Sequence, residues 1–124
     1  MNNKVFGEII FNVGWKTKSA ITLFKRETTV VVKAKAYREE DGISSEQEKS
    51  YLEYTNNKQT LLKSMENMLS KYSDNAANRF VPKTLLFERD GSWALLCDDL
   101  LNPDEGIAIC MKPEKKIVLQ DDYL

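Results

Sequence analysis

The chain has 124 residues, with 18 basic and 19 acidic side chains, two cysteines and no histidine. Without histidine, Ser-His-Asp and Cys-His catalytic sites, histidine-ligated zinc and an imidazole proton shuttle are excluded. The net charge of −1 lacks the basic excess that is typical of a nucleic-acid-binding domain. The length suits a single domain, residues 1–124, with a real core that needs neither disulfides nor metal.

We expect neither a targeting signal nor a membrane span from this sequence. Its first residues lack the apolar stretch of a secretory signal, and no apolar run approaches the roughly 20 residues that span a bilayer. Asn2 excludes N-myristoylation, which requires glycine at that position. We therefore expect a cytoplasmic protein without membrane contacts. Cys97 and Cys110 fit this expectation as buried free thiols, with a disulfide or redox pair as the alternative.

The first third of the chain is predicted to form strands. Residues 6–11 are rich in apolar side chains, and residues 19–25 and 28–37 follow. The polar residues 26–27 are predicted to connect the two longer strands. This part of the chain therefore predicts antiparallel pairing between neighbours in the sequence.

Side chains in the second long strand alternate between two faces. Val30, Val32 and Ala34 share one face, whereas Lys33 and Lys35 share the other. A period of two is typical of a strand with one buried face. The two lysines are predicted to face water.

A long helix is predicted over residues 45–72. Ser44 and Gln47 have the spacing of a capping box, in which each side chain accepts a hydrogen bond from the other residue's backbone. An apolar stripe at helical spacing is predicted to pack on the sheet; it comprises Leu61, Leu62, Met65, Met68, Leu69 and Tyr72. Residues 55–57 are weak helix formers and predict a kink or a break.

The last third of the chain is again predicted to form strands, over residues 83–89, 92–98, 107–112 and 117–120. Asp90 and Gly91 are typical of a hairpin turn between the first two. The order of strands, long helix and strands predicts an α+β fold. We expect a single mostly antiparallel sheet of six to seven strands with the helix packed on one face.

A single helix covers only one face of such a sheet. Several strands of the last third have apolar residues on both faces, including Leu85, Leu86 and Phe87. The second face is therefore predicted to curl over, to be covered by loops or to be buried in a homodimer.

No catalytic motif stands out, and the motifs of nucleotide-binding loops and of redox or zinc-binding cysteines are absent. The clearest group of functional side chains consists of four carboxylates, with Asp98 and Asp99 at one end of a predicted loop and Asp104 and Glu105 at the other. Three interpretations stay open. The carboxylates form a solvated loop, a surface for a basic partner, or a calcium site whose spacing departs from the EF-hand pattern.

Short motifs over nearly the whole chain carry a family resemblance. They are Gly7-Glu8 before Trp15, Asp41-Gly42-Ile43-Ser44 with Gln47, Leu85-Leu86-Phe87, Asp98-Asp99 followed by Glu105-Gly106-Ile107-Ala108, and the final Gln120-Asp121-Asp122-Tyr123-Leu124. Together they resemble a family of small uncharacterised bacterial domains that is grouped with the immunity and regulatory proteins of polymorphic toxin systems. The resemblance implies a bacterial protein that binds rather than catalyses. Physically, Gly91 and Gly106 are predicted to adopt positive φ.

These observations predict a non-enzymatic binding protein with no cofactor, of the type that inhibits a toxin by docking. Its partner is predicted to be a protein, such as a basic toxin, and not nucleic acid. The predicted binding face comprises Asp98, Asp99, Asp104, Glu105, Asp121 and Asp122. The alternative is a structural or small-ligand-binding homodimer that uses the second face of the sheet.

Charge is unevenly distributed along the chain. Residues 1–38 contain 8 basic and 2 acidic side chains, whereas residues 81–124 contain 5 and 9. If the two segments interleave in the sheet, the charges pair; if they lie apart, the protein has a basic part and an acidic part.

Overall fold

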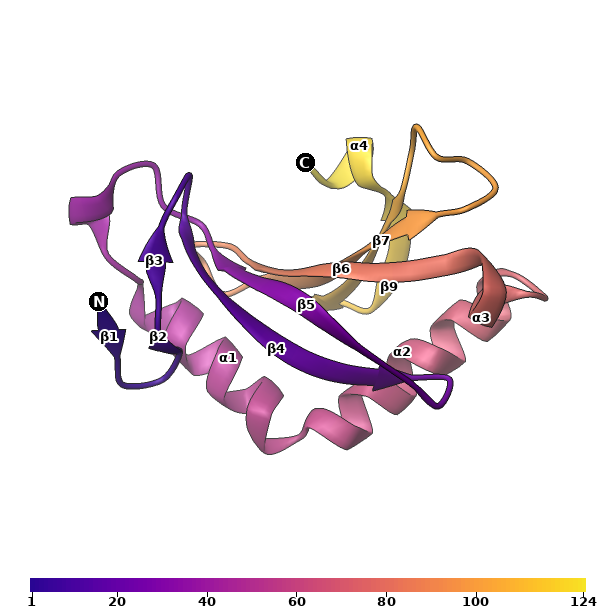
Figure 1. The fold of residues 1–124 in the computed structure, drawn as a ribbon, viewed down its shortest axis with the longest axis horizontal. Helices are drawn as coiled ribbons and strands as arrows, with labels where there is room; N and C mark the ends of the chain where they lie inside the picture. Colours follow the sequence, from indigo (N-terminus) through magenta and orange to yellow (C-terminus); the bar gives the residue numbers. More distant parts are fainter.

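A seven-stranded sheet runs through the computed structural model, which describes residues 1–124 (Figure 1). The strands lie in the order in which they occur along the chain: β3 (Ile10–Phe11), β4 (Trp15–Leu23), β5 (Arg26–Ala34), β6 (Phe80–Phe87), β7 (Trp93–Asp99), β8 (Ile107–Lys112) and β9 (Lys116–Leu119). All neighbours are antiparallel except β5 and β6. The predicted α+β fold with a mostly antiparallel sheet is confirmed.

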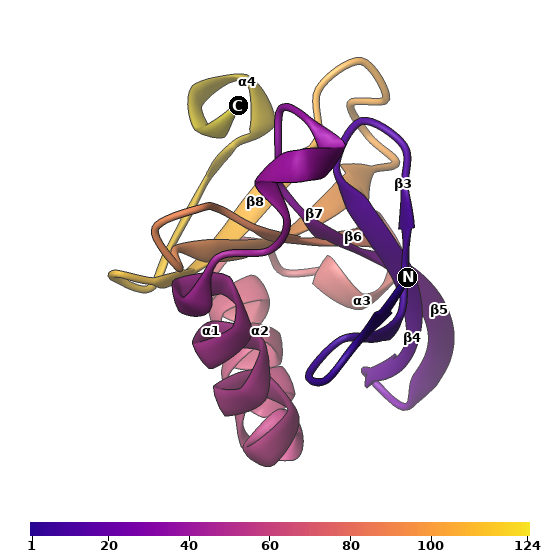
Figure 2. The same ribbon diagram turned by 90° about the vertical axis from the view of Figure 1, so that its left-hand side faces the viewer.

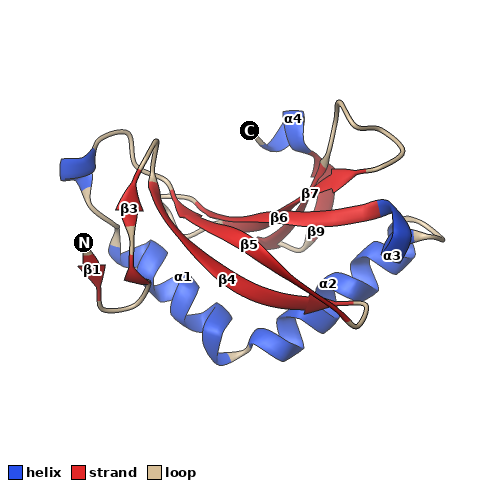
Figure 3. Cartoon of the chain, viewed as in Figure 1, coloured by secondary structure: helices blue, strands red, loops and turns tan.

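Two consecutive helices, α1 (Ser45–Asn56) and α2 (Lys58–Tyr72), lie on one face of this sheet (Figures 2 and 3). They form the crossover between β5 and β6, the kind of connection that parallel neighbours require. The remaining elements are short: β1 (Asn2–Asn3) and β2 (Gly7–Glu8), which pair with each other, the 3₁₀ turn η1 (Glu39–Asp41), α3 (Ala76–Arg79) and α4 (Gln120–Tyr123). None of the helices has both the length and the apolar character needed to cross a membrane.

The start of α1 and the break after it follow the prediction. The Gln47 backbone N–H donates to Ser44 Oγ at 3.1 Å, and the Ser44 N–H donates to Gln47 Oε1 at 2.9 Å. The helical stretch breaks at Asn57, which ends α1 and precedes α2. The predicted capping box and the predicted break are both confirmed.

The core lies between the helices and the sheet. From α2, Leu62, Met65 and Leu69 are buried against it. An aromatic group fills the space beneath α1, where the rings of Tyr51 and Phe87 meet edge to face with centroids 5.4 Å apart. Burial of this apolar stripe, rather than helix propensity, is what holds such helices in place.

The hairpin of β4 and β5 turns two residues earlier than the sequence predicted. The turn consists of Phe24 and Lys25, with φ of 52° and 63°, and Arg26 already belongs to β5. Positive φ at both central residues is the geometry of a type I′ turn, whose twist matches that of the flanking strands. The prediction placed the turn at residues 26–27 because neither Phe24 nor Lys25 is a usual turn residue.

The second face of the sheet is partly covered by the chain's own end. Ala94, Ala108 and Cys110 are buried there, and Tyr123 of α4 packs over them. Figure 2 shows α4 on the side of the sheet opposite α1 and α2. The β7–β9 half of this face is therefore covered by a short terminal helix, which was not among the three ways predicted from the sequence.

Candidate partner-binding surface

The strand order separates the charges of the sheet. The basic segment forms β4 and β5 and the acidic segment forms β6 to β9, so the two parts do not interleave. Lys16 lies directly opposite Lys33 on the helix-free face. Burial, together with the charges of Lys16 and Lys35, lowers the pKa of Lys33. One half of the helix-free face is therefore basic.

At the other half, the loop of residues 100–106 joins β7 to β8 and rises on the helix-free side, as does α4 (Figure 1). We call these residues the acidic loop. Leu100 and Leu101 are 59% and 77% exposed, and Asp104 is exposed as well. A loop that serves only to be solvated is expected to expose polar side chains, whereas this loop exposes two adjacent leucines next to a carboxylate.

Asp99 does not belong to the exposed surface. Its side chain is only 4% exposed and accepts hydrogen bonds from Arg79 Nε at 2.9 Å and Arg79 Nη2 at 2.8 Å. It also accepts the Leu101 backbone N–H at 3.0 Å. The hydrogen bonds from Arg79 hold the pKa of this carboxyl below its usual range. The prediction that Asp99 contacts a partner is corrected: Asp99 supports the loop from beneath.

The other predicted residues are at the surface but do not converge. Asp98 points to the opposite side of β7 from Asp99, where its Oδ2 lies 3.9 Å from Lys83 Nζ. Asp104, Asp121 and Asp122 are exposed, and Glu105 is half-buried. No group of three or more acidic or cysteine side chains is placed to hold a metal ion. Asp98 and Asp99 point apart because adjacent residues of a strand face opposite sides.

Gln120 anchors the end of the acidic loop. Its Nε2 donates to the carbonyls of Cys97 and Ile107 at 2.8 and 3.3 Å, and its backbone N–H donates to the Gly106 carbonyl at 2.9 Å. A Cβ on Gly106 would clash with the Cys97 carbonyl and the Gln120 side chain. The loop is thus fixed at both ends, by Arg79 through Asp99 and by Gln120.

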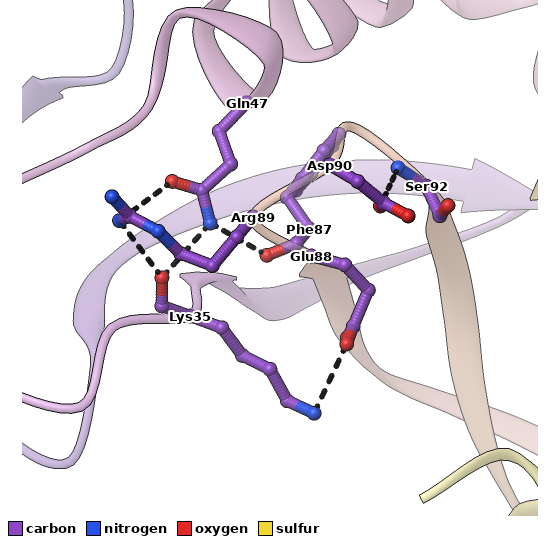
Figure 4. A network of polar contacts seen from close by, with 7 residues as sticks. All are labelled: Lys35, Gln47, Phe87, Glu88, Arg89, Asp90 and Ser92. Atoms are coloured by element: carbon purple, nitrogen blue, oxygen red, sulfur yellow. Dashed lines mark hydrogen bonds and ion pairs between the residues drawn. The ribbon is translucent and has the colours of Figure 1, made fainter.

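A second polar network lies at the opposite end of β6 (Figure 4). Arg89 Nη1 donates to the Gly42 carbonyl at 2.7 Å and to Gln47 Oε1 at 3.3 Å. Lys35 Nζ pairs with Glu88 Oε1 at 3.1 Å. Arg89 was not predicted from the sequence, because its partners lie more than 40 residues away along the chain. Its donors are used inside the protein, so this network joins elements and does not offer a free cation.

The cavities differ in size and in lining. A largely apolar cavity of about 240 Å³ lies among Leu23, Leu69 and Phe80, below the range of roughly 300–1,000 Å³ that ligand pockets occupy. A polar hollow of about 450 Å³, whose lining includes Lys35 and Arg89, falls within that range. Cys97 and Cys110 are buried free thiols. They belong to clusters on opposite faces of the sheet, which excludes a disulfide between them in this fold.

No family model, curated protein or solved structure matches the chain. The resemblance to immunity-type domains therefore stays a prediction from short motifs.

Proposed function

We propose that this protein is a non-enzymatic bacterial binding protein that docks a basic protein partner through the acidic loop and α4, as an immunity-type inhibitor of a toxin would. One observation carries the proposal. Leu100 and Leu101 are adjacent, exposed and carried on a loop that is anchored at both ends.

Anchoring favours binding because a partner gains contacts without first ordering the loop. Hydrogen bonds of Arg79, Asp99 and Gln120 already fix the two ends of the loop in the free protein, so binding loses less conformational entropy. The two leucines then supply apolar surface, because the fully buried core of an interface is more apolar than the rest of a protein surface.

The exposed carboxylates supply the charge complementarity. Asp104 is exposed on the acidic loop, Asp98 near the end of β7, and Asp121 and Asp122 on α4. Such a surface speeds the association of a basic partner and repels an acidic one. We place the interaction in the cytoplasm, with no cofactor involved.

The product of the adjacent gene is the natural partner to test. The two proteins are co-expressed, co-purified and assayed for neutralisation of any toxicity that the neighbour shows alone. Leu101→Ser and Asp104→Lys are expected to weaken the complex while leaving the fold intact, because both side chains are exposed.

Matched controls come from exposed residues elsewhere. Leu52→Ser on α1 and Glu40→Lys in η1 make the same chemical changes far from the acidic loop along the chain. They should bind as the unmodified protein does. If the neighbour neither binds nor is toxic, or if the control variants lose binding equally, the proposal is wrong.

The homodimer alternative has its own readout. Light scattering that shows a dimer at micromolar concentration, disrupted by Leu101→Ser, would assign the leucines to self-association instead.

A further inference from the structure

The outer edge of β4 lacks a strand partner over most of its length. The edge strand β3 pairs only with Trp15 and Lys16, whereas β4 continues to Leu23. Residues 17–23 therefore border the sheet without a neighbour, as Figure 3 shows for the long strand at the front. An unpartnered edge of this kind is a template for an added strand.

The turn geometry identifies which backbone groups face outward. In a two-residue hairpin the residues that flank the turn, Leu23 and Arg26, form a hydrogen-bonded pair. Because bonded and non-bonded pairs alternate in an antiparallel ladder, Lys18, Ala20 and Thr22 direct their N–H and C=O groups away from β5. The Ala20 carbonyl confirms this direction, since it accepts a hydrogen bond from Lys58 Nζ of α2.

A groove runs along this edge, between β4 and the first turns of α2. It has a volume of about 580 Å³, and its lining includes Ala20, Thr22, Lys58 and Leu62. A strand edge on one wall and a helix on the other leave room for an extended segment. Main-chain hydrogen bonds to the edge then provide affinity, and the groove selects alternate side chains.

The charges favour an acidic occupant. Neither Lys18 nor Lys58 has a carboxylate within ion-pair distance, whereas Lys63 pairs with Glu66 at 3.6 Å. Glu27 lines the groove at the turn end of β4, opposite Thr22. Of the groove's lysines, Lys58 is thus the one without a carboxylate partner, and a carboxylate of the segment would lie near Lys58 and away from Glu27.

We propose that the outer edge of β4 binds an extended, acidic segment of a partner protein by strand addition. The segment pairs with the outward backbone groups of Lys18, Ala20 and Thr22. One of its carboxylates binds Lys58, which exchanges its hydrogen bond to the Ala20 carbonyl for this ion pair and leaves that carbonyl to the segment's N–H. This surface shares no residue with the acidic loop, so it can fail or succeed independently of the proposed function.

A second copy of the chain fits this edge less well. Antiparallel pairing of two β4 strands about Ala20 would place Lys18 of one copy opposite Thr22 of the other, a pair without like-charge repulsion. It would also bring both Lys58 side chains to the same pair of alanine carbonyls, where like charges repel. Charge thus favours an acidic segment from another protein.

The probe is a fluorescent peptide with the sequence acetyl-Thr-Val-Glu-Val-Glu-Val-Thr-amide, and the control peptide carries lysine in place of glutamate. We expect the acidic peptide to bind and the basic peptide not to bind. Amide chemical-shift changes should centre on Lys18, Ala20 and Thr22. Ala20→Pro removes one outward N–H and should weaken binding roughly five- to tenfold, whereas Ala20→Val keeps the N–H and should not.

Modified peptides keep the test independent of protein folding. N-methylation of the residues that face β4 should abolish binding, and N-methylation of the alternate residues should not. Equal binding of acidic and basic peptides, equal effects of the two methylation patterns, or shifts confined to the acidic loop would each overturn the proposal. A dimer of the unmodified chain that Ala20→Pro converts to monomer would also overturn it, by assigning the edge to a second copy.

Discussion

Arg79 Nε and Nη2 donate two hydrogen bonds, of 2.9 and 2.8 Å, to the two oxygens of the buried Asp99 carboxylate. The pair joins α3, which follows the long helices, to the last residue of β7. Bidentate pairing fixes both the position and the orientation of the carboxylate. The acidic loop thus starts from a defined point, even though its tip is exposed.

Replacing Asp99 with asparagine should destabilise the protein at neutral pH. The change weakens the charge-assisted bonds from Arg79 and puts an amide where only acceptors are needed, at a cost of about 1–3 kcal/mol in the free energy of unfolding. Urea unfolding followed by tryptophan fluorescence measures this loss. Asp98→Asn is the matched control, because that side chain is exposed and its ion pair with Lys83 is long; it should change stability little.

The stability lost on replacing Asp99 with asparagine should depend on pH. The pKa of Asp99 is lowered in the folded protein by the hydrogen bonds from Arg79. A lowered pKa stabilises the fold above the unfolded pKa of about 4, and this stabilisation is lost as the pH falls through the folded pKa. The stability difference between the unmodified protein and Asp99→Asn should therefore be full at pH 7 and shrink below about pH 4. A constant difference down to pH 2 would contradict this assignment.

Local patterns explain which parts of the fold could be predicted. The alternation of Val30, Val32 and Ala34 with lysines reports burial directly, and the Ser44–Gln47 capping box depends on residues three apart. Strand alternation and the capping box each depend on residues a few positions apart, so both can be recognised from the sequence alone. The turn at Phe24 and Lys25 is local too, but its backbone follows strand twist rather than residue preference.

Contacts between residues far apart in the sequence explain which features of the candidate site could not be predicted. Asp98 and Asp99 look equivalent in the sequence, yet one faces water and the other binds Arg79, 20 residues away along the chain. Gly91 adopts a φ of 92° as predicted. Gly106 does not have positive φ; it is glycine because the Cys97 carbonyl and Gln120 leave no space for a Cβ.

Gly106→Ala should therefore destabilise the end of the acidic loop. The added methyl group meets a backbone carbonyl that cannot move aside and the amide of Gln120, so we expect a loss of about 1–3 kcal/mol, the usual cost of overpacking. Thermal unfolding measures it, and hydrogen exchange should show faster opening of the Gln120 N–H. Gly7→Ala is the comparison, since its Cβ meets nothing and costs only the strain of positive φ. Equal losses in the two variants would contradict the steric explanation.

Gln47→Leu should be among the most damaging single changes in the chain. Gln47 is fully buried, and its Nε2 donates to the carbonyls of Lys35 and Phe87 at 2.9 and 3.0 Å. Leucine removes the partner of the Ser44 N–H, and the Phe87 and Lys35 carbonyls then keep only the Lys35 N–H and Arg89 Nη1, at 3.0 and 3.3 Å. Losing these buried hydrogen bonds should cost about 1–3 kcal/mol in the free energy of unfolding. Gln59→Leu, on an exposed position of α2, is the matched control and should unfold at nearly the unmodified temperature.

Both thiols should resist modification until the protein unfolds. Cys97 is fully buried on the helix side of the sheet, and burial raises its pKa to about 12. Burial also raises the pKa of Cys110, which lies on the opposite face beneath Tyr123. Because the thiolate is the reacting species, Ellman's reagent at pH 8 should report no fast thiol in the native protein and two in guanidinium chloride. Cys110→Ala should leave the slow reaction of Cys97 unchanged, since the two residues lie in separate clusters. Fast reaction of either thiol in the native state would show that its face of the sheet opens to solvent.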